Sequence, residues 1–193
     1  MEYKKPNIIA EIGCNHKGKI SVAKELLKLA KESNADVAKF QKRNNKELLT
    51  IEQYEAPHPN PINSYGATYG AHREFLEFNL EQHKELKSYC EEIGLEYSTS
   101  VWDSTSAREI ISLNPSLIKV PSACNNHFEM LTILRDEFQG MVHISFGMTT
   151  HVEEEEIIAL FEETGQAKRL VIYSCTSGYP VPFKDVCLLE INR

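Results

Sequence analysis

The sequence predicts an α/β fold in which short parallel strands alternate with helices. Six short apolar runs recur along the 193 residues, and each run ends in polar side chains. Most of these runs are followed by apolar residues at helical spacing. A strand, a crossover helix and a second strand, repeated in this way, build a parallel sheet. The six runs are residues 8–16, 36–41, 95–100, 117–122, 141–146 and 170–175.

The composition is that of a single globular domain. Hydrophobic residues make up 41% of the chain and charged residues 25%, which is enough to bury one core. A net charge of -7 argues against a nucleic-acid surface. No apolar run is long enough to cross a bilayer, and residues 1–6 lack the apolar stretch of a signal peptide. We therefore expect a cytoplasmic protein that binds neither nucleic acid nor membrane.

The five cysteines predict reduced thiols. They form no CxxC pair, and their spacing gives no support for a zinc site. They are Cys14, Cys90, Cys124, Cys175 and Cys187.

The first connecting segment predicts an amphipathic outer helix over residues 21–33. Val22, Leu26 and Leu29 fall on one face of that helix, and lysines and glutamates fall on the other. Asn34 is expected to end it.

The helix predicted over residues 79–93 has signals at both ends. Asn79 is an expected N-cap, with Gln82 three residues later as in a capping box. Gly94 is expected to terminate the helix. The residues expected to face inward are Leu86, Cys90 and Ile93.

Three further signals come from the second half of the chain. Asp103 is expected to start a helix that ends before Asn114, which precedes a proline. Four glutamates at 153–156 are best explained as favourable charges at the positive end of a helix dipole, in preference to a metal site. Residues 185–193 are expected to begin a last helix.

The connection at residues 42–78 is much longer than a usual loop of roughly 4 to 6 residues. In a parallel sheet it leaves the carboxyl end of a strand, so we expect it to lie over the same face as Glu11 and Lys39. Two readings of its ring-bearing and basic residues stay open, namely that they cover a ligand or that they only pack the loop down. These residues are Tyr65, Tyr69, His72 and Arg73.

A barrel explains the strand ends better than an open sheet does. No GxGxxG follows the first strand, and polar residues stand at nearly every strand end instead of at one switch point. A closed eight-unit barrel typically needs about 250 residues. The sequence therefore predicts one domain over residues 1–193, a (β/α)8 TIM barrel truncated to about six βα units.

Two lysines near strand ends, Lys39 and Lys119, predict an anionic ligand. A charge in an otherwise apolar strand is costly and needs a partner. Alternation along the second strand puts Gln41 on the same side as Lys39. Fixed cations with nearby hydroxyls suit a small molecule that carries phosphate and carboxylate groups. The hydroxyls are those of Thr99, Ser122 and Ser145.

Other roles for the charged residues remain open. Either lysine could instead form an ion pair with Glu11. Glu11 could act as a general base or accept a sugar hydroxyl, or it could serve only as that ion-pair partner. Lys119 could form a Schiff base, as in barrel aldolases.

The ordered series of strand-end motifs resembles the N-acetylneuraminate (sialic acid) synthase family of nonulosonic acid synthases. The match runs through the whole chain and keeps its order, so it is more specific than any single motif. The motifs are IAEIGCNHKG from Ile9, AKFQ from Ala38, STS from Ser98, IKVPS from Ile118, SFGM from Ser145 and CTSGYPVPFKDV from Cys175.

The resemblance implies a transferase of carbohydrate biosynthesis that condenses phosphoenolpyruvate with an N-acylated hexosamine, N-acetylmannosamine or a relative. The products are a nine-carbon 2-keto sugar acid and phosphate. A divalent metal, Mn²⁺ or Mg²⁺, polarises the sugar aldehyde in that family, and the full-length enzyme is expected to be a homodimer.

Residue roles follow from the same resemblance. Glu11 and Lys119 are the expected catalytic residues, with Glu11 and Tyr179 contacting the sugar. Ser177 is an expected substrate-binding residue and stands where many relatives carry asparagine. The residues expected to hold phosphoenolpyruvate or line its pocket are Lys39, Gln41, Thr99, Lys119, Ser122 and Ser145.

The family's metal-binding histidines and its C-terminal antifreeze-like domain are expected to lie outside these 193 residues, so no metal ligand is assigned here. Two alternatives to the synthase stand beside it. One is a barrel aldolase or related lyase that uses Lys119, and the other is a non-catalytic truncated binding protein.

Overall fold

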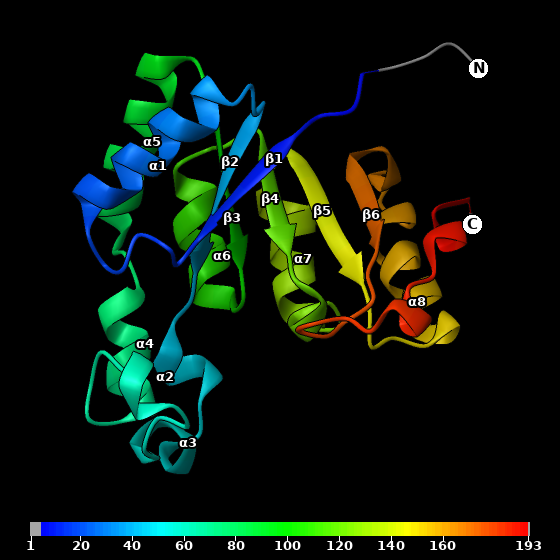
Figure 1. The fold of residues 1–193 in the computed structure, drawn as a ribbon. Coiled ribbons are helices and arrows are strands. Elements are labelled where there is room, and N and C mark those ends of the chain that lie inside the picture. The colour runs from blue at the N-terminus through cyan, green and yellow to red at the C-terminus, as the bar shows by residue number, and fades with distance from the viewer. Residues whose placement is uncertain (1–4, 193) are drawn as a thin grey trace. The chain divides into compact units, whose positions relative to one another are not determined.

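The structure is a computed structural model that describes residues 5–192 (Figure 1). It confirms the predicted α/β fold, since strands and helices alternate along the chain and the recorded strand pairs are parallel. The chain divides into two compact units, one up to Ser100 and one from Val101.

The first unit has the strand order β1-β2-β3. β1 and β2 are parallel, with Glu11 opposite Lys39. The helices α1 and α5 pack side by side (Figure 1). The elements are β1 (Ile9–Gly13), α1 (Ile20–Glu32), β2 (Val37–Lys42), α2 (Asn45–Leu48), α3 (Ile51–Glu55), η1 (Pro61–Asn63), α4 (Tyr69–Leu76), α5 (Leu80–Ile93) and β3 (Glu96–Val101).

The second unit has the strand order β4-β5-β6, with both pairs parallel. Neither unit closes a barrel by itself within residues 5–192, because each contributes an open run of strands. The elements are α6 (Ser104–Ser112), β4 (Leu117–Val120), η2 (Ser122–Cys124), α7 (Phe128–Glu137), β5 (Met141–Phe146), α8 (His151–Glu162), η3 (Ala167–Arg169), β6 (Leu170–Ser174), η4 (Phe183–Asp185) and η5 (Leu188–Asn192).

Each unit has its own apolar core. In the first unit Leu27 from α1 and Leu86 from α5 cover Phe40 of β2, and all three side chains are fully buried. In the second unit Leu134 of α7 and Ile144 of β5 belong to a separate buried cluster. Burial of a large aliphatic or aromatic side chain contributes about 1.5–3 kcal/mol, so these residues hold the strands that carry the polar ends.

The buried face of α1 differs from the predicted one. Ala23, Leu27 and Ala30 are buried, whereas Leu29 is 57% exposed. The expected face of Val22, Leu26 and Leu29 is therefore wrong by one residue, which is a rotation of about 100° around the helix axis. Alanines at two of the three inward positions allow a close approach that the larger side chains would prevent.

The ends of α5 confirm the prediction. The Asn79 side chain accepts from the backbone N–H of Gln82, and the Gln82 side chain accepts from the backbone N–H of Asn79. Gly94 ends the helix with φ +68°, a left-handed conformation that glycine adopts without steric cost. Leu86 and Cys90 are buried as expected.

Two other predicted elements need correction. β4 ends at Val120 instead of Ser122, because Pro121 has no N–H to continue the ladder and Ser122 begins the short turn η2. The predicted last helix at 185–193 is wrong for its described part, where residues up to 192 form two short 3₁₀ turns, η4 and η5.

The long connection after β2 is ordered into three short helices. Thr50 and Gln53 form a capping box at the start of α3. Gly70 of α4 lies directly against Tyr54 of α3, where a Cβ atom at position 70 would come within 2.3 Å of the ring. The helices α3 and α4 therefore pack closely against each other, and Figure 1 shows both within the insertion that follows β2.

Candidate functional site

Glu11, Lys39 and Gln41 meet at the carboxyl ends of β1 and β2. The Lys39 ammonium forms an ion pair with the Glu11 carboxylate, and Gln41 Nε2 donates to Glu11 Oε1 at 2.9 Å. The Lys39 side chain is 13% exposed and that of Glu11 48% exposed. The ion pair between a strand lysine and Glu11, which the sequence left open as one of two possibilities, is therefore present for Lys39. Solvent or a ligand can still reach the Glu11 carboxylate.

The β3 hydroxyl beside Lys39 belongs to Ser100. Its Oγ lies 3.5 Å from Lys39 Nζ. Thr99 is fully buried, and its Oγ1 has no hydrogen-bond partner within residues 5–192. Because neighbouring side chains alternate between the two faces of a strand, the face of Ser100 is not the face of Thr99. The geometry thus favours Ser100 over the predicted Thr99 as the hydroxyl at this strand end.

A buried cluster that sequence reasoning missed joins the same two strand ends. Arg43 follows β2, and its Nη2 lies 2.8 Å from the Sγ of Cys14, which follows β1. The Arg43 Nε and backbone N–H both donate to the carboxylate of Glu77, at the end of the insertion. The Arg43 and Glu77 side chains are each 8% exposed. One feature of the sequence could have indicated this cluster, namely that the charged residue Arg43 directly follows an apolar strand.

Burial sets the acid-base properties of this cluster. Desolvation raises the pKa of the Glu77 carboxyl above its ordinary value, and the Arg43 guanidinium partly opposes that rise. Burial likewise raises the pKa of the Cys14 thiol. A thiol with a raised pKa is a poor nucleophile at neutral pH, so Cys14 is a structural member of the cluster.

The ring-bearing residues of the insertion also come together. The His72 ring lies 4.2 Å from that of His58, and it stacks on Tyr65 at 5.7 Å between centroids. Arg73 Nη1 donates to Tyr69 Oη at 3.1 Å, and the guanidinium carbon lies 5.7 Å from the Tyr69 ring centroid. The four residues singled out in the sequence therefore belong to one group on and before α4.

In the second unit Lys119 is the centre of a polar group on β4, β5 and β6. It is 7% exposed, and its Nζ donates to Ser145 Oγ and to the Val120 carbonyl, each at 2.6 Å. Its ammonium lies 5.1 Å from the centroid of the Tyr173 ring. Two oxygen acceptors and an aromatic face suit a protonated amine, whereas a Schiff-base lysine must be neutral to attack.

Tyr173 and His143 are further members that sequence reasoning missed. Lys119 is opposite His143 in the register, and Ser145 is opposite Tyr173. His143 Nδ1 lies 2.8 Å from Tyr173 Oη. Burial raises the pKa of the Tyr173 hydroxyl. Strand alternation was the signal, since His143 and Ser145 are two residues apart and share a face.

The loops after β4, β5 and β6 approach one another in the second unit. Ser177 Oγ donates to Ser122 Oγ at 3.0 Å. Asn125 Nδ2 donates to the carbonyls of Ser145 and Gly147, at 2.9 and 3.2 Å. A Cβ at Gly147 would lie 2.7 Å from Ser177 Oγ, so this contact requires glycine. The predicted sugar contact, Tyr179, is fully exposed.

The described residues contain no group of three His, Cys, Asp or Glu side chains that could hold a metal ion. The five cysteines are free thiols. None of the helices within residues 5–192 is both long enough and apolar enough to span a bilayer.

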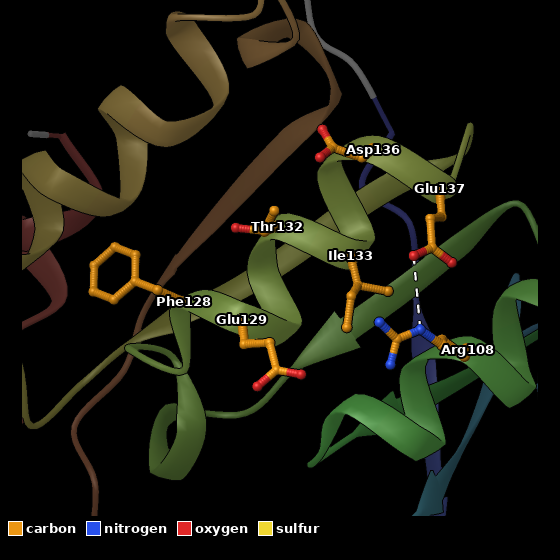
Figure 2. Close-up of a pocket in the computed structure, with 7 residues that line it drawn as sticks. All are labelled: Arg108, Phe128, Glu129, Thr132, Ile133, Asp136 and Glu137. Atoms are coloured by element: carbon orange, nitrogen blue, oxygen red, sulfur yellow. Dashed lines mark ion pairs between the residues drawn. The ribbon is translucent and has the colours of Figure 1, made fainter.

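A pocket of about 390 Å³ lies on helices and not at strand ends (Figure 2). It is lined from α6 and α7, and Arg108 Nε faces Glu137 Oε1 across it at 3.7 Å. None of its residues was a predicted site residue, so the pocket is separate from the Lys119 group. The lining residues are Arg108, Phe128, Glu129, Thr132, Ile133, Asp136 and Glu137.

Comparison with known proteins assigns the chain to a family. Residues 26–193 match the model of the NeuB family. The chain belongs to the NeuB family. This confirms the resemblance to nonulosonic acid synthases that the strand-end motifs indicated.

Two curated relatives of this NeuB-family chain illustrate the range of the family. N-acetylneuraminate-9-phosphate synthase of Mus musculus is 36% identical over 186 residues, covering 96% of this chain and 51% of that protein. N,N'-diacetyllegionaminic acid synthase of Campylobacter jejuni is 28% identical over 186 residues, covering 96% of this chain and 55% of that protein. The chain spans about half the length of the curated relatives it matches.

A solved structure supports the fold. The N-acetylneuraminic acid (sialic acid) synthetase of Leptospira borgpetersenii, in complex with citrate, superposes with a TM-score of 0.80 at 22% identity. The match covers 97% of this chain and 60% of that one.

Proposed function

We propose that the whole protein is a synthase that condenses phosphoenolpyruvate with an N-acylated hexosamine. C3 of phosphoenolpyruvate forms a bond to the aldehyde carbon of the open-chain sugar, water adds at C2, and phosphate leaves. The observation that carries the proposal is Lys119, a buried strand lysine whose ammonium is fixed by Ser145 and the Val120 carbonyl. Membership of the NeuB family supports the same chemistry.

The proposed roles follow the polar groups of each unit. In the first unit, Lys39 and Ser100 bind phosphoenolpyruvate, and Gln41 orients Glu11, the proposed acceptor of a sugar hydroxyl. Fixed ammonium groups suit phosphate and carboxylate because they neutralise charge without reorganising.

In the second unit, Lys119, Ser145 and Ser122 contribute to phosphoenolpyruvate binding, and Ser177 supports Ser122. Tyr179 remains a proposed sugar contact. The divalent metal that the family resemblance implies finds no fitting cluster among the described residues. We propose further that residues 1–193 form part of a TIM-barrel domain and that the whole protein acts as a cytoplasmic homodimer.

The acceptor proposed first is a 6-phosphorylated N-acyl hexosamine. The relative with 36% identity is named for a 9-phosphate product. Three of the nine product carbons come from phosphoenolpyruvate, so C9 of the product corresponds to C6 of the sugar. A neutral N-acyl hexosamine such as N-acetylmannosamine is the alternative.

The test is phosphate release from phosphoenolpyruvate by the full-length protein. It compares N-acetylmannosamine, its 6-phosphate and the related diacetamido sugars, each with Mn²⁺ or Mg²⁺. Mass spectrometry should detect a nine-carbon 2-keto acid. Release no higher than that of a Lys119→Met variant, with every sugar and either metal, would contradict the proposed function.

A further inference from the structure

The insertion after β2 carries a cation whose charge is not matched locally. Arg43 and Arg73 both lie near the carboxylate of Glu77, and Arg43 donates to both of its oxygens. Arg73 has no carboxylate within ion-pair distance among the described residues. Its Nε is buried and donates no hydrogen bond. A half-buried guanidinium with open donors and excess positive charge is suited to bind an anion.

The neighbours of Arg73 add donors of the same kind. Tyr69 Oη accepts from Arg73 Nη1 at 3.1 Å, which leaves the hydroxyl hydrogen free to donate elsewhere. His72 Nδ1 accepts from the backbone N–H of Tyr65 at 3.1 Å, so a neutral His72 carries its proton on Nε2. Burial, together with His58 and the nearby arginines, lowers the pKa of His72, which keeps the ring neutral at pH 7. Guanidinium, phenol and imidazole thus offer donors to a tetrahedral oxyanion.

This group is held rigidly at the strand end that carries Glu11. The Thr68 side chain caps α4 by accepting from the Ala71 N–H. Gly18, in the turn after β1, has φ +68°, and a Cβ there would lie 2.4 Å from the Phe75 carbonyl of α4. The backbone of α4 therefore packs directly on the turn that follows β1. A ligand at Glu11 and an anion at Arg73 would contact the same end of the first unit.

We propose that Arg73, with Tyr69 and His72, binds the terminal phosphate of a phosphorylated acyl-hexosamine acceptor. The inference rests on the proposed function and assigns the part of the molecule that distinguishes a phosphorylated acceptor from a neutral one. The phosphate oxygens accept hydrogen bonds from the Arg73 guanidinium, which has no carboxylate partner among the described residues. The carbonyl end of the same sugar stays free to react.

The experiment compares Arg73→Gln with Lys46→Gln in the full-length protein. Lys46 is an exposed cation of the same insertion, so both variants lose one positive charge. A charge-assisted contact of this kind corresponds to about a 10- to 100-fold change. Arg73→Gln should raise KM for N-acetylmannosamine 6-phosphate by about that factor, with KM for phosphoenolpyruvate and for N-acetylmannosamine within about twofold. Lys46→Gln should change none of them.

Titration calorimetry with N-acetylmannosamine 6-phosphate separates this inference from the synthase proposal, because it needs no turnover. In the absence of phosphoenolpyruvate, wild-type protein should bind the sugar phosphate at least tenfold more tightly than Arg73→Gln does. If Arg73→Gln weakened the binding of both sugars equally, Arg73 would be a structural residue. If the variant raised KM for phosphoenolpyruvate, Arg73 would instead contact phosphoenolpyruvate. Either result, or equal calorimetric affinity of wild type and variant, overturns the inference.

Discussion

The two strand lysines are held in different ways. Lys39 of the first unit pairs with a carboxylate that is half exposed, whereas Lys119 of the second unit donates to a carbonyl and a hydroxyl and lies over an aromatic ring. Because the Glu11 carboxylate is half exposed, we expect it to turn toward another donor when an anion reaches Lys39. The acceptors of Lys119 belong to strands and are fixed. The comparison shows that the carboxylate partner of Lys39 is accessible, whereas the acceptors of Lys119 belong to the strands.

The largest effect is expected from Lys119→Met. Removing a fixed charge that faces developing negative charge should lower kcat/KM for phosphoenolpyruvate by about 10³-fold. Circular dichroism should show an unchanged fold, since methionine fills most of the volume. Borohydride trapping of a covalent adduct on Lys119 of the wild-type enzyme would reverse the assignment and favour the aldolase alternative.

Arg43→Met should destabilise the first unit by about 3 kcal/mol, because it leaves the buried Glu77 carboxylate without its partner. Glu77 has a raised pKa in the folded state, so its protonated form is favoured there, and stability is lost as pH rises above the ordinary value of 4.5. The deficit of the variant should therefore be larger at pH 8 than at pH 5 in urea denaturation.

A double variant, Arg43→Met with Glu77→Gln, is the matched control for that cluster. It should recover part of the stability, because no charge remains buried. A double variant as unstable as the single one at pH 8 would show that packing, and not charge, explains the loss.

Glu11→Gln tests the role of the carboxylate that pairs with Lys39. If Glu11 works on the sugar, kcat should fall by about 10²-fold, which is the lower end of the range for general acid-base catalysis. KM for phosphoenolpyruvate should stay within about threefold, since Lys39 keeps its charge. A large rise in that KM with unchanged kcat would make Glu11 only a support for Lys39.

The smallest effect per residue is an acid sensitivity of the first unit, to which two buried histidines contribute. Burial lowers the pKa of His83 to about 3 and that of His16 to about 4. Both rings are neutral when folded and become protonated on unfolding, so stability is lost as pH falls below about 6.5. As the pH falls from 6.5 to 5, each of the two histidines should lower the free energy of unfolding by about 2 kcal/mol.

Hydrogen exchange by mass spectrometry can locate that loss. Protection of β1, β2 and α5 should fall more steeply with acid than protection of β4 and β5. His83→Gln should remove roughly half of the difference in acid sensitivity between the two units. Equal acid sensitivity of the two units would contradict the assignment.

Strand periodicity was enough to predict contacts between neighbouring strands. The expected grouping of Glu11, Lys39 and Gln41 and the pairing of Lys119 with Ser145 are present in the structure. These contacts depend only on which residues end each strand and on alternation along it.

Contacts that depend on one-residue precision or on distant partners could not be predicted. A single step along β3 decides between Thr99 and Ser100, and the sequence offers hydroxyls at both positions. Arg43 finds Glu77 34 residues later, across an insertion whose path no local pattern defines. The face of α1 was misjudged because alanines, and not the larger apolar residues, point inward.

The close approach of Gly18 to the carbonyl of Phe75 restricts how this protein can evolve or be engineered. If the segment between β2 and α5 of this chain were moved into a relative that carries a side chain at the position of Gly18, that side chain would clash with the backbone of the transplanted helix α4. Such a transfer should therefore exchange the β1–α1 turn and the insertion as a single piece.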